Sequence, residues 1–166
     1  MKRRIKYFFL LTALTLLLAA LTACGASGGG EGELTCTVSI SCATVLDNWE
    51  QCDESKRGLI PSDGIFLPET EVSFTEGESV FDVLERVCKA NQLHMESSFT
   101  PAYGSAYVEG IGNLYEFDVG ALSGWMYAVN GWFPNYGCSQ YVLQDGDTVE
   151  WRYTCDLGAD VGQIMS

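Results

Sequence analysis

GWMYAVNGWFPNYGCSQYVLQDGDTVEWRYTCD, residues Gly124–Asp156, is the stretch that decides the fold. It carries three of the four tryptophans of the chain and five other aromatic residues: Trp125, Trp132, Trp151, Tyr127, Phe133, Tyr136, Tyr141 and Tyr153. Aromatic rings bury a large area, and they also form stacking platforms with polar handles. The stretch is therefore either the core of a small β domain or that core together with a ligand-facing loop, and we favour the second interpretation.

Two strands are predicted within this stretch, because large apolar side chains recur at every second position. Side chains alternate across a strand, so this pattern is typical of strands with one buried face. The sequence Asp145-Gly146-Asp147 predicts a turn just before the second strand. The alternating apolar positions are Trp125, Tyr127 and Val129 in the first strand and Val149, Trp151 and Tyr153 in the second.

The segment between the two strands, residues 130–137, combines turn residues with large aromatic rings. Glycine and proline indicate a loop, but an exposed loop normally lacks large aromatic side chains unless they bind something. Trp132, Phe133 and Tyr136 could fold back as a small core of their own, since single exposed aromatics are common. We predict instead that they form an exposed aromatic lip.

The remaining elements follow from periodicity and capping signals. Val80, Val83, Leu84, Val87 and Cys88 form a helical stripe behind a Ser79–Asp82 capping box. Two strands, one helix and then several strands predict an α+β fold, a β-grasp-like mixed sheet with one main helix. The expected elements are strands at 35–42, 71–75, 93–99, 103–108 and 114–119, a helix from Ser79 to about Asn91, and a long connection over 43–68 in which a short helix or a function is expected.

The chain resembles the C-terminal β domain of the transcobalamin and intrinsic factor family, and especially its bacterial lipoprotein relatives. The resemblance runs from about Thr35 to Gly162, and its most specific piece is GWMYxVNGxFPN. EVSFTEGESVFDVLERVC resembles the strand-then-helix opening of that domain. The resemblance implies a β-grasp fold of the soluble-ligand-binding type. In that family the β domain covers one face of cobalamin, and a separate α/α-barrel domain holds the other face.

The first 23 residues are typical of a lipoprotein signal peptide. Lys2, Arg3, Arg4 and Lys6 precede the apolar run 7–20, and Leu21-Thr22-Ala23-Cys24 forms a lipobox. We expect Cys24 to carry the lipid, residues 24–33 to form a flexible glycine-rich tether, and residues 34–166 to form the transcobalamin-like domain. An ordinary cleaved signal with a chance cysteine is the alternative.

Charge excludes one class of function. Four of the nine basic residues lie in the signal segment, while all 22 acidic residues lie beyond it, so residues 24–166 carry a net charge of −17. Nucleic-acid binding needs a basic surface, and the five remaining basic residues are too few. We expect contact with the membrane through the lipid anchor alone.

Six cysteines remain after Cys24, and an even number outside the cytoplasm indicates disulfides. Cys138 and Cys155 are the most plausible pair because they flank one predicted hairpin, but free buried thiols are an alternative. With one histidine and no CxxC pair, no metal site is expected. No catalytic residue is expected either: His94 falls at a strand edge, and Asp145 and Asp147 belong to a turn.

Two classes of function remain. The first is a cell-surface module that captures cobalamin or a related corrinoid, as one half of a site shared with an α/α-barrel protein or a corrinoid transporter. No cofactor is required. The second is an adhesion or protein-interaction module that uses the same aromatics. The candidate ligand-binding residues are Trp132, Phe133, Asn135, Tyr136, Asn130, Tyr103 and Tyr107.

Overall fold

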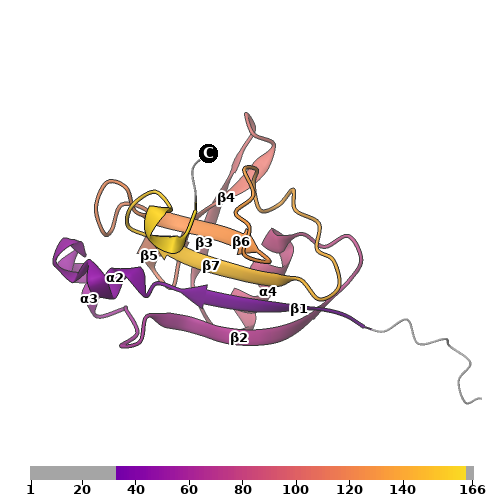
Figure 1. Ribbon diagram of the computed structural model, residues 1–166, viewed down its shortest axis with the longest axis horizontal. Coiled ribbons are helices and arrows are strands. Elements are labelled where there is room, and N and C mark those ends of the chain that lie inside the picture. The colour runs from indigo at the N-terminus through magenta and orange to yellow at the C-terminus, as the bar shows by residue number, and fades with distance from the viewer. Residues whose placement is uncertain (1–32, 164–166) are drawn as a thin grey trace, which may run out of the picture. The chain divides into compact units, whose positions relative to one another are not determined.

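The first and last long strands of the domain, β1 (Leu34–Ser41) and β7 (Thr148–Thr154), lie side by side and parallel. β2 (Ile65–Phe74) pairs antiparallel with β1, and β6 (Gly124–Val129) pairs antiparallel with β7. The result is a mixed four-stranded sheet in the order β2-β1-β7-β6. Figure 1 shows this sheet in the computed structural model, with helix α4 (Val80–Ala90) behind it. The predicted α+β, β-grasp-like class is confirmed.

The structure describes residues 33–163. The expected signal segment, the lipobox with Cys24 and nearly all of the expected tether lie outside the described residues. Among the residues that are described, no helix is both long and apolar enough to cross a membrane.

Strand β2 begins earlier than predicted. The sequence pattern predicts Pro68 in a connection, whereas β2 already starts at Ile65. Proline lacks an N–H and is tolerated only on edge strands or at bulges. β2 is an edge strand, and its register with β1 shifts between the Val38–Thr70 and Ile40–Leu67 pairs, on either side of Pro68. Pro68 therefore fits inside the strand.

The long connection before β2 contains short helices, as predicted. These are α2 (Thr44–Asp47), the 3₁₀ helix η1 (Trp49–Gln51) and α3 (Glu54–Arg57). Val45 and Cys52 anchor the connection in the core, since they are 0% and 3% exposed.

Helix α4 begins at the predicted capping box. The Ser79 hydroxyl accepts from the Asp82 backbone N–H, and the Asp82 carboxylate accepts from the Ser79 backbone N–H at 2.8 Å. The predicted apolar stripe is buried, and the helix ends next to Asn91. A capping box satisfies backbone donors that the first helical turn leaves free, so the local sequence sets where α4 starts.

A second sheet, of three strands, follows the helix in the order β3 (Met95–Thr100), β4 (Ser105–Ile111) and β5 (Leu114–Tyr115). The predicted strand over 114–119 is wrong beyond Tyr115. The Asp118 carboxylate accepts from the Tyr115 N–H at 2.7 Å, and Phe117 has a φ of 69°. This side-chain bond closes a turn in place of further strand pairing.

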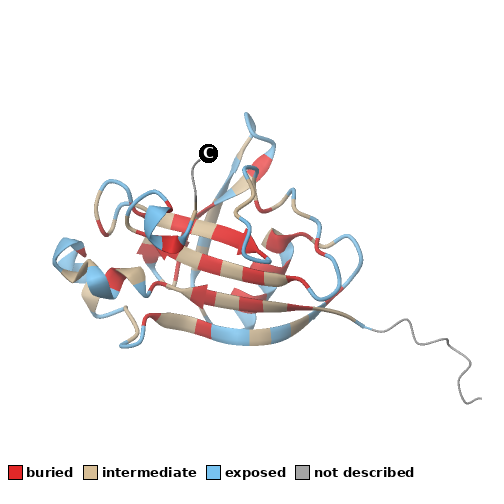
Figure 2. Ribbon diagram, in the orientation of Figure 1, coloured by how far each residue is buried: buried red, intermediate tan, exposed pale blue. Residues whose placement is uncertain are grey.

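The core lies between the sheets and α4, and Figure 2 shows buried and partly buried positions alternating along the central strands β1 and β7. The Trp125 Nε1–H donates to the Leu114 carbonyl at 2.8 Å. The Tyr153 hydroxyl donates to the Tyr115 carbonyl at 2.7 Å. Two buried aromatics of the first sheet thus hold β5 of the second sheet in place.

The six cysteines of the described part are all free thiols: Cys36, Cys42, Cys52, Cys88, Cys138 and Cys155. The proposed Cys138–Cys155 disulfide is therefore wrong, and the alternative of free thiols holds. Burial raises the pKa of Cys42 and of Cys88 to about 12, because a thiolate is poorly solvated in the core. Within residues 33–163, no three or more His, Cys, Asp or Glu side chains lie close enough together to hold a metal ion.

Candidate functional site

One groove brings together two segments that are distant in the sequence. We call it the tyrosine groove, and its volume is about 420 Å³, within the range of small-molecule sites. One side comes from the β3–β4 hairpin and the other from the loop after β6. Its lining consists of Thr100, Tyr103, Ser105, Ala106, Tyr107, Pro134, Asn135, Tyr136, Gly137 and Gln140.

The β3–β4 hairpin supplies two tyrosines. Tyr103 lies in the turn between the strands and is 78% exposed, while Tyr107 projects from β4 and is 45% exposed. The Tyr107 hydroxyl donates to the Glu116 carboxylate at 2.5 Å. Partial burial raises the pKa of Tyr107 to about 12, and the hydrogen bond to Glu116 is the second cause of this shift. The groove therefore presents Tyr107 as a neutral ring at physiological pH.

The loop that forms the opposite side leaves β6 through a tight turn. Asn130 and Gly131 both have positive φ, 53° and 76°, and the Trp132 N–H donates to the Val129 carbonyl at 2.9 Å. An Asn-Gly pair is the preferred sequence for such a turn. Further along, the buried Tyr127 donates its hydroxyl to the Tyr136 carbonyl at 2.9 Å. The core thus holds the aromatic loop by its backbone.

The two sides meet closely at the floor of the groove. A Cβ on Gly137 would lie 1.6 Å from the Ser105 Oγ, so glycine is required there by close approach. The Ser139 hydroxyl accepts from the Ala106 N–H at 2.9 Å and lies 3.0 Å from the Ser105 Oγ. The Gln140 amide donates to the Tyr103 carbonyl at 3.0 Å. These contacts fix the width of the groove before any ligand arrives.

The predicted site residues divide into two groups. Tyr103, Tyr107, Asn135 and Tyr136 line the tyrosine groove together. Trp132 is 54% exposed and packs edge-on against Tyr136, with ring centroids 6.1 Å apart, but it stands outside the groove lining.

Phe133, half-buried, also stands outside the groove lining. Asn130 is occupied elsewhere: its amide donates to Asp147 at 2.8 Å and accepts from the Thr148 N–H at 2.9 Å. Its amide secures the turn, and Asn130 stands outside the groove lining.

A second groove lies on the other side of Tyr107. We call it the leucine groove, and its volume is about 410 Å³. Phe117, Leu122 and Leu157 line it and are 62%, 45% and 54% exposed. Phe117 and Leu157 also have positive φ, 69° and 46°, which is uncommon for bulky residues. Tyr107 lines both grooves and forms the ridge between them.

Sequence reasoning missed several lining residues. Thr100 and Gln140 belong to the tyrosine groove, but their residue types are those of ordinary turns and strand ends. Gly137 was visible only as a loop glycine. The entire leucine groove was also missed, because Phe117 was assigned to a strand.

Comparison with known proteins gives a family match and two similar structures. Residues 77–155 match a family model described as a domain of unknown function, DUF4430. The chain resembles the transcobalamin-like family, as its sequence predicted. No curated protein matches the chain.

Among solved structures, the chain is 20% identical to haptocorrin in complex with Cbi, with a TM-score of 0.49. The match covers 81% of this chain but only 28% of the haptocorrin chain. A protein from Ruminococcus gnavus, described as metal-binding, is also 20% identical, with a TM-score of 0.44. That match covers 74% of this chain and 97% of the other.

Proposed function

We propose that this protein is a non-enzymatic binding module, held outside the cytoplasm by a lipid on Cys24, that captures cobalamin or a related corrinoid. The observation that supports this proposal is the tyrosine groove, in which the β3–β4 hairpin and the loop after β6 meet. Both segments carry binding candidates chosen from the sequence. The resemblance to the transcobalamin-like family supplies the ligand class.

The chemistry of the groove suits a large ring compound with polar edges. Tyr103, Tyr107 and Tyr136 offer aromatic faces, and Asn135 and Gln140 offer amide groups. Ligand sites generally combine apolar walls with a few placed polar groups. A corrin ring with its amide-bearing periphery presents both kinds of surface. Aromatic contact would supply affinity, and the amides would orient the ring.

The size of the groove suits only part of such a ligand. A corrinoid is larger than about 420 Å³, so the groove would cover one portion of it and leave the rest exposed. We therefore propose a two-part site, completed by an α/α-barrel protein or by a corrinoid transporter. Binding by this chain alone would then be weaker than binding by the assembled pair.

The groove offers no recognisable catalytic group among its described residues. The Ser105 hydroxyl is engaged with Ser139 and with the Ala106 carbonyl, and no histidine or carboxylate lines the groove to activate it. His94 instead bonds the Tyr115 hydroxyl at 2.9 Å. These placements favour binding over catalysis.

The proposal is tested by titrating the full-length protein in mild detergent with cobalamin, following tryptophan fluorescence. Tyr103→Ala and Tyr136→Ala should each weaken binding by about 1–3 kcal/mol, the loss expected of an interface anchor. Trp132→Ala should do the same if the aromatic lip extends beyond the groove. The matched control is Phe99→Ala, which removes another exposed ring that does not line the groove.

The unfolding midpoints of all four variants should stay close to that of the wild type. Tyrosine variants that bind as tightly as the wild type would rule out this groove as the site. A wild type that binds no corrinoid, even with candidate barrel proteins or transporters present, would favour the interaction module instead.

The proposed anchor is tested separately. Wild-type cells fed a labelled fatty acid should show label on this protein, and Cys24→Ser should abolish it. Cys36→Ser is a matched control, because Cys36 is 1% exposed inside β1 and is unsuited to lipidation. If the wild-type protein carries no label, the lipid anchor is ruled out and the alternative, an ordinary cleaved signal peptide, is favoured.

A further inference from the structure

The tyrosine groove carries no charge of its own. All ten described residues that line it are uncharged. The carboxylate tied to its wall is Glu116, which accepts the hydroxyl proton of Tyr107 at 2.5 Å. Glu116 also lines the adjoining leucine groove. A ligand in the tyrosine groove would therefore meet neutral rings and amides, with negative charge close behind one wall.

The basic side chains of the described part all lie outside the groove lining. Lys56 pairs with Asp118 at 3.1 Å, Arg86 pairs with Glu78 at 3.2 Å, and Arg152 pairs with Glu150. Arg57 lies over the Trp49 ring, and Lys89 lies on α4 beside a separate hollow. No Lys or Arg among residues 33–163 lines either groove.

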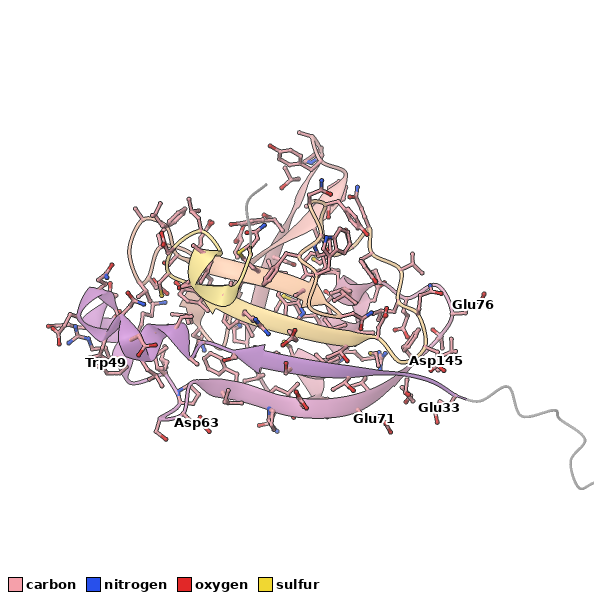
Figure 3. The ribbon with its side chains drawn as sticks, in the orientation of Figure 1. Glu33, Trp49, Asp63, Glu71, Glu76 and Asp145 are labelled. Atoms are coloured by element: carbon pink, nitrogen blue, oxygen red, sulfur yellow. The ribbon has the colours of Figure 1, made fainter. Side chains whose placement is uncertain are left out.

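The chain as a whole is strongly acidic. Beyond the signal segment the chain carries 22 acidic and five basic side chains. Figure 3 shows labelled carboxylates such as Glu71 and Glu76 projecting outward from the edges of the fold. An excess of one sign of charge raises or lowers the local concentration of a charged ligand. Here it disfavours anions.

We infer that the tyrosine groove selects ligands by charge, preferring a neutral or cationic ring compound over one that carries a phosphate monoester. The inference rests on the proposed function for its ligand class. A phosphate in the groove would lose hydration without gaining a counter-charge, which is unfavourable. Aromatic faces, in contrast, attract cations. Among corrinoids, those without a phosphate monoester should therefore bind best.

The matched probes are cobinamide and cobinamide phosphate, which differ by one phosphate ester. Each is titrated into the full-length protein in neutral detergent, at low and at high salt. At low salt cobinamide should bind about tenfold more tightly, and the ratio should shrink at high salt as charges are screened. Equal affinities at low salt would overturn the inference while leaving corrinoid binding intact. Failure of both probes to bind would overturn the proposed function as well.

A positive charge placed in the groove should abolish the preference for cobinamide. Asn135 lines the groove and is exposed, so Asn135→Lys should strengthen binding of cobinamide phosphate by about tenfold, relative to cobinamide. Ser62→Lys is the control, because it adds the same charge at an exposed position outside both grooves. Circular dichroism checks that both variants fold. If the two lysines shift the ratio equally, net charge rather than the groove sets the preference, and the inference fails.

Discussion

Trp151 is the best measure of whether the strand phases are right. It lies in the middle of β7, 2% exposed, with its ring centroid 5.6 Å from that of Tyr127. Its indole N–H is the only buried side-chain polar atom in the described part that has no hydrogen-bond partner. The packing of the ring, rather than a polar contact, is therefore what holds this residue.

Trp151→Ala should destabilise the protein by about 3–5 kcal/mol, the range for truncating a large buried aromatic. Glu71→Ala, on the exposed face of β2, should change stability by less than about 0.5 kcal/mol. Urea unfolding followed by far-UV circular dichroism gives both values. Equal midpoints for the two variants would contradict the assigned phase of β7.

Gly137 should be intolerant of even one added methyl group. Its Cβ would lie 2.3 Å from the Ser105 Cβ as well as 1.6 Å from the Oγ, so Gly137→Ala should cost about 1–3 kcal/mol through overpacking. Ser105→Gly removes both clashing atoms. The double variant should therefore lose less stability than the sum of the two single variants, as a double-mutant cycle would measure. Strict additivity would mean that the loop and β4 do not touch as described.

For single residues, the sequence predicted buried positions well and side-chain hydrogen-bond partners poorly. Alternation correctly predicted that Trp125, Tyr127 and Trp151 point inward. Asn130 shows the limit. An amide that binds a ligand and an amide that secures a turn look the same in a sequence, and only the contact with Asp147 separates them.

Helix α4 shows how a local signal fixes an element. Ser79 is 5% exposed, and its hydroxyl accepts from the Asp82 N–H while donating to the Asp82 carboxylate at 2.7 Å. Ser79→Ala should therefore cost about 1 kcal/mol. Glu85→Ala, exposed on the same helix, serves as the control and should be near neutral. A Ser79→Ala variant as stable as that control would mean that the capping box does not position α4.

Elements with local signals were predicted closely, and elements set by distant contacts were not. The capping box and the apolar stripe of α4 both lie within a dozen residues. β5 is held in place by Trp125 and Tyr153, whose side chains reach it from the other sheet. β2 is longer than predicted because Pro68 is acceptable only at the sheet edge. Neither condition can be seen from neighbouring residues.

Across the whole molecule, the free thiols should make the fold sensitive to alkali. Burial raises the pKa of Cys36 to about 11 and that of Cys42 and Cys88 to about 12, from an ordinary value of 9.0. Below pH 9.0 the thiols keep their protons in the folded and in the unfolded state, so their raised pKa values do not lower the free energy of unfolding. Above it the unfolded thiols ionise while the folded ones do not, and stability falls.

Urea midpoints measured with a reducing agent should therefore fall between about pH 9 and about pH 11. Tyrosines with raised pKa, such as Tyr127, act in the same direction. Cys88→Ala should make the decline shallower, because it removes one buried thiol. A midpoint that is constant across this range would contradict the burial of the thiols.

The parallel pairing of β1 with β7 also dictates when the chain can fold. Thr37 lies opposite Thr148 in the centre of the sheet, so the first strand to be synthesised waits for the last one. Until then Val38 and Ile40 have only β2 beside them, and contacts so distant in sequence form slowly. A ribosome-bound chain that ends before β7 therefore cannot complete this sheet, and the apolar side chains of β1 stay exposed until β7 has been made.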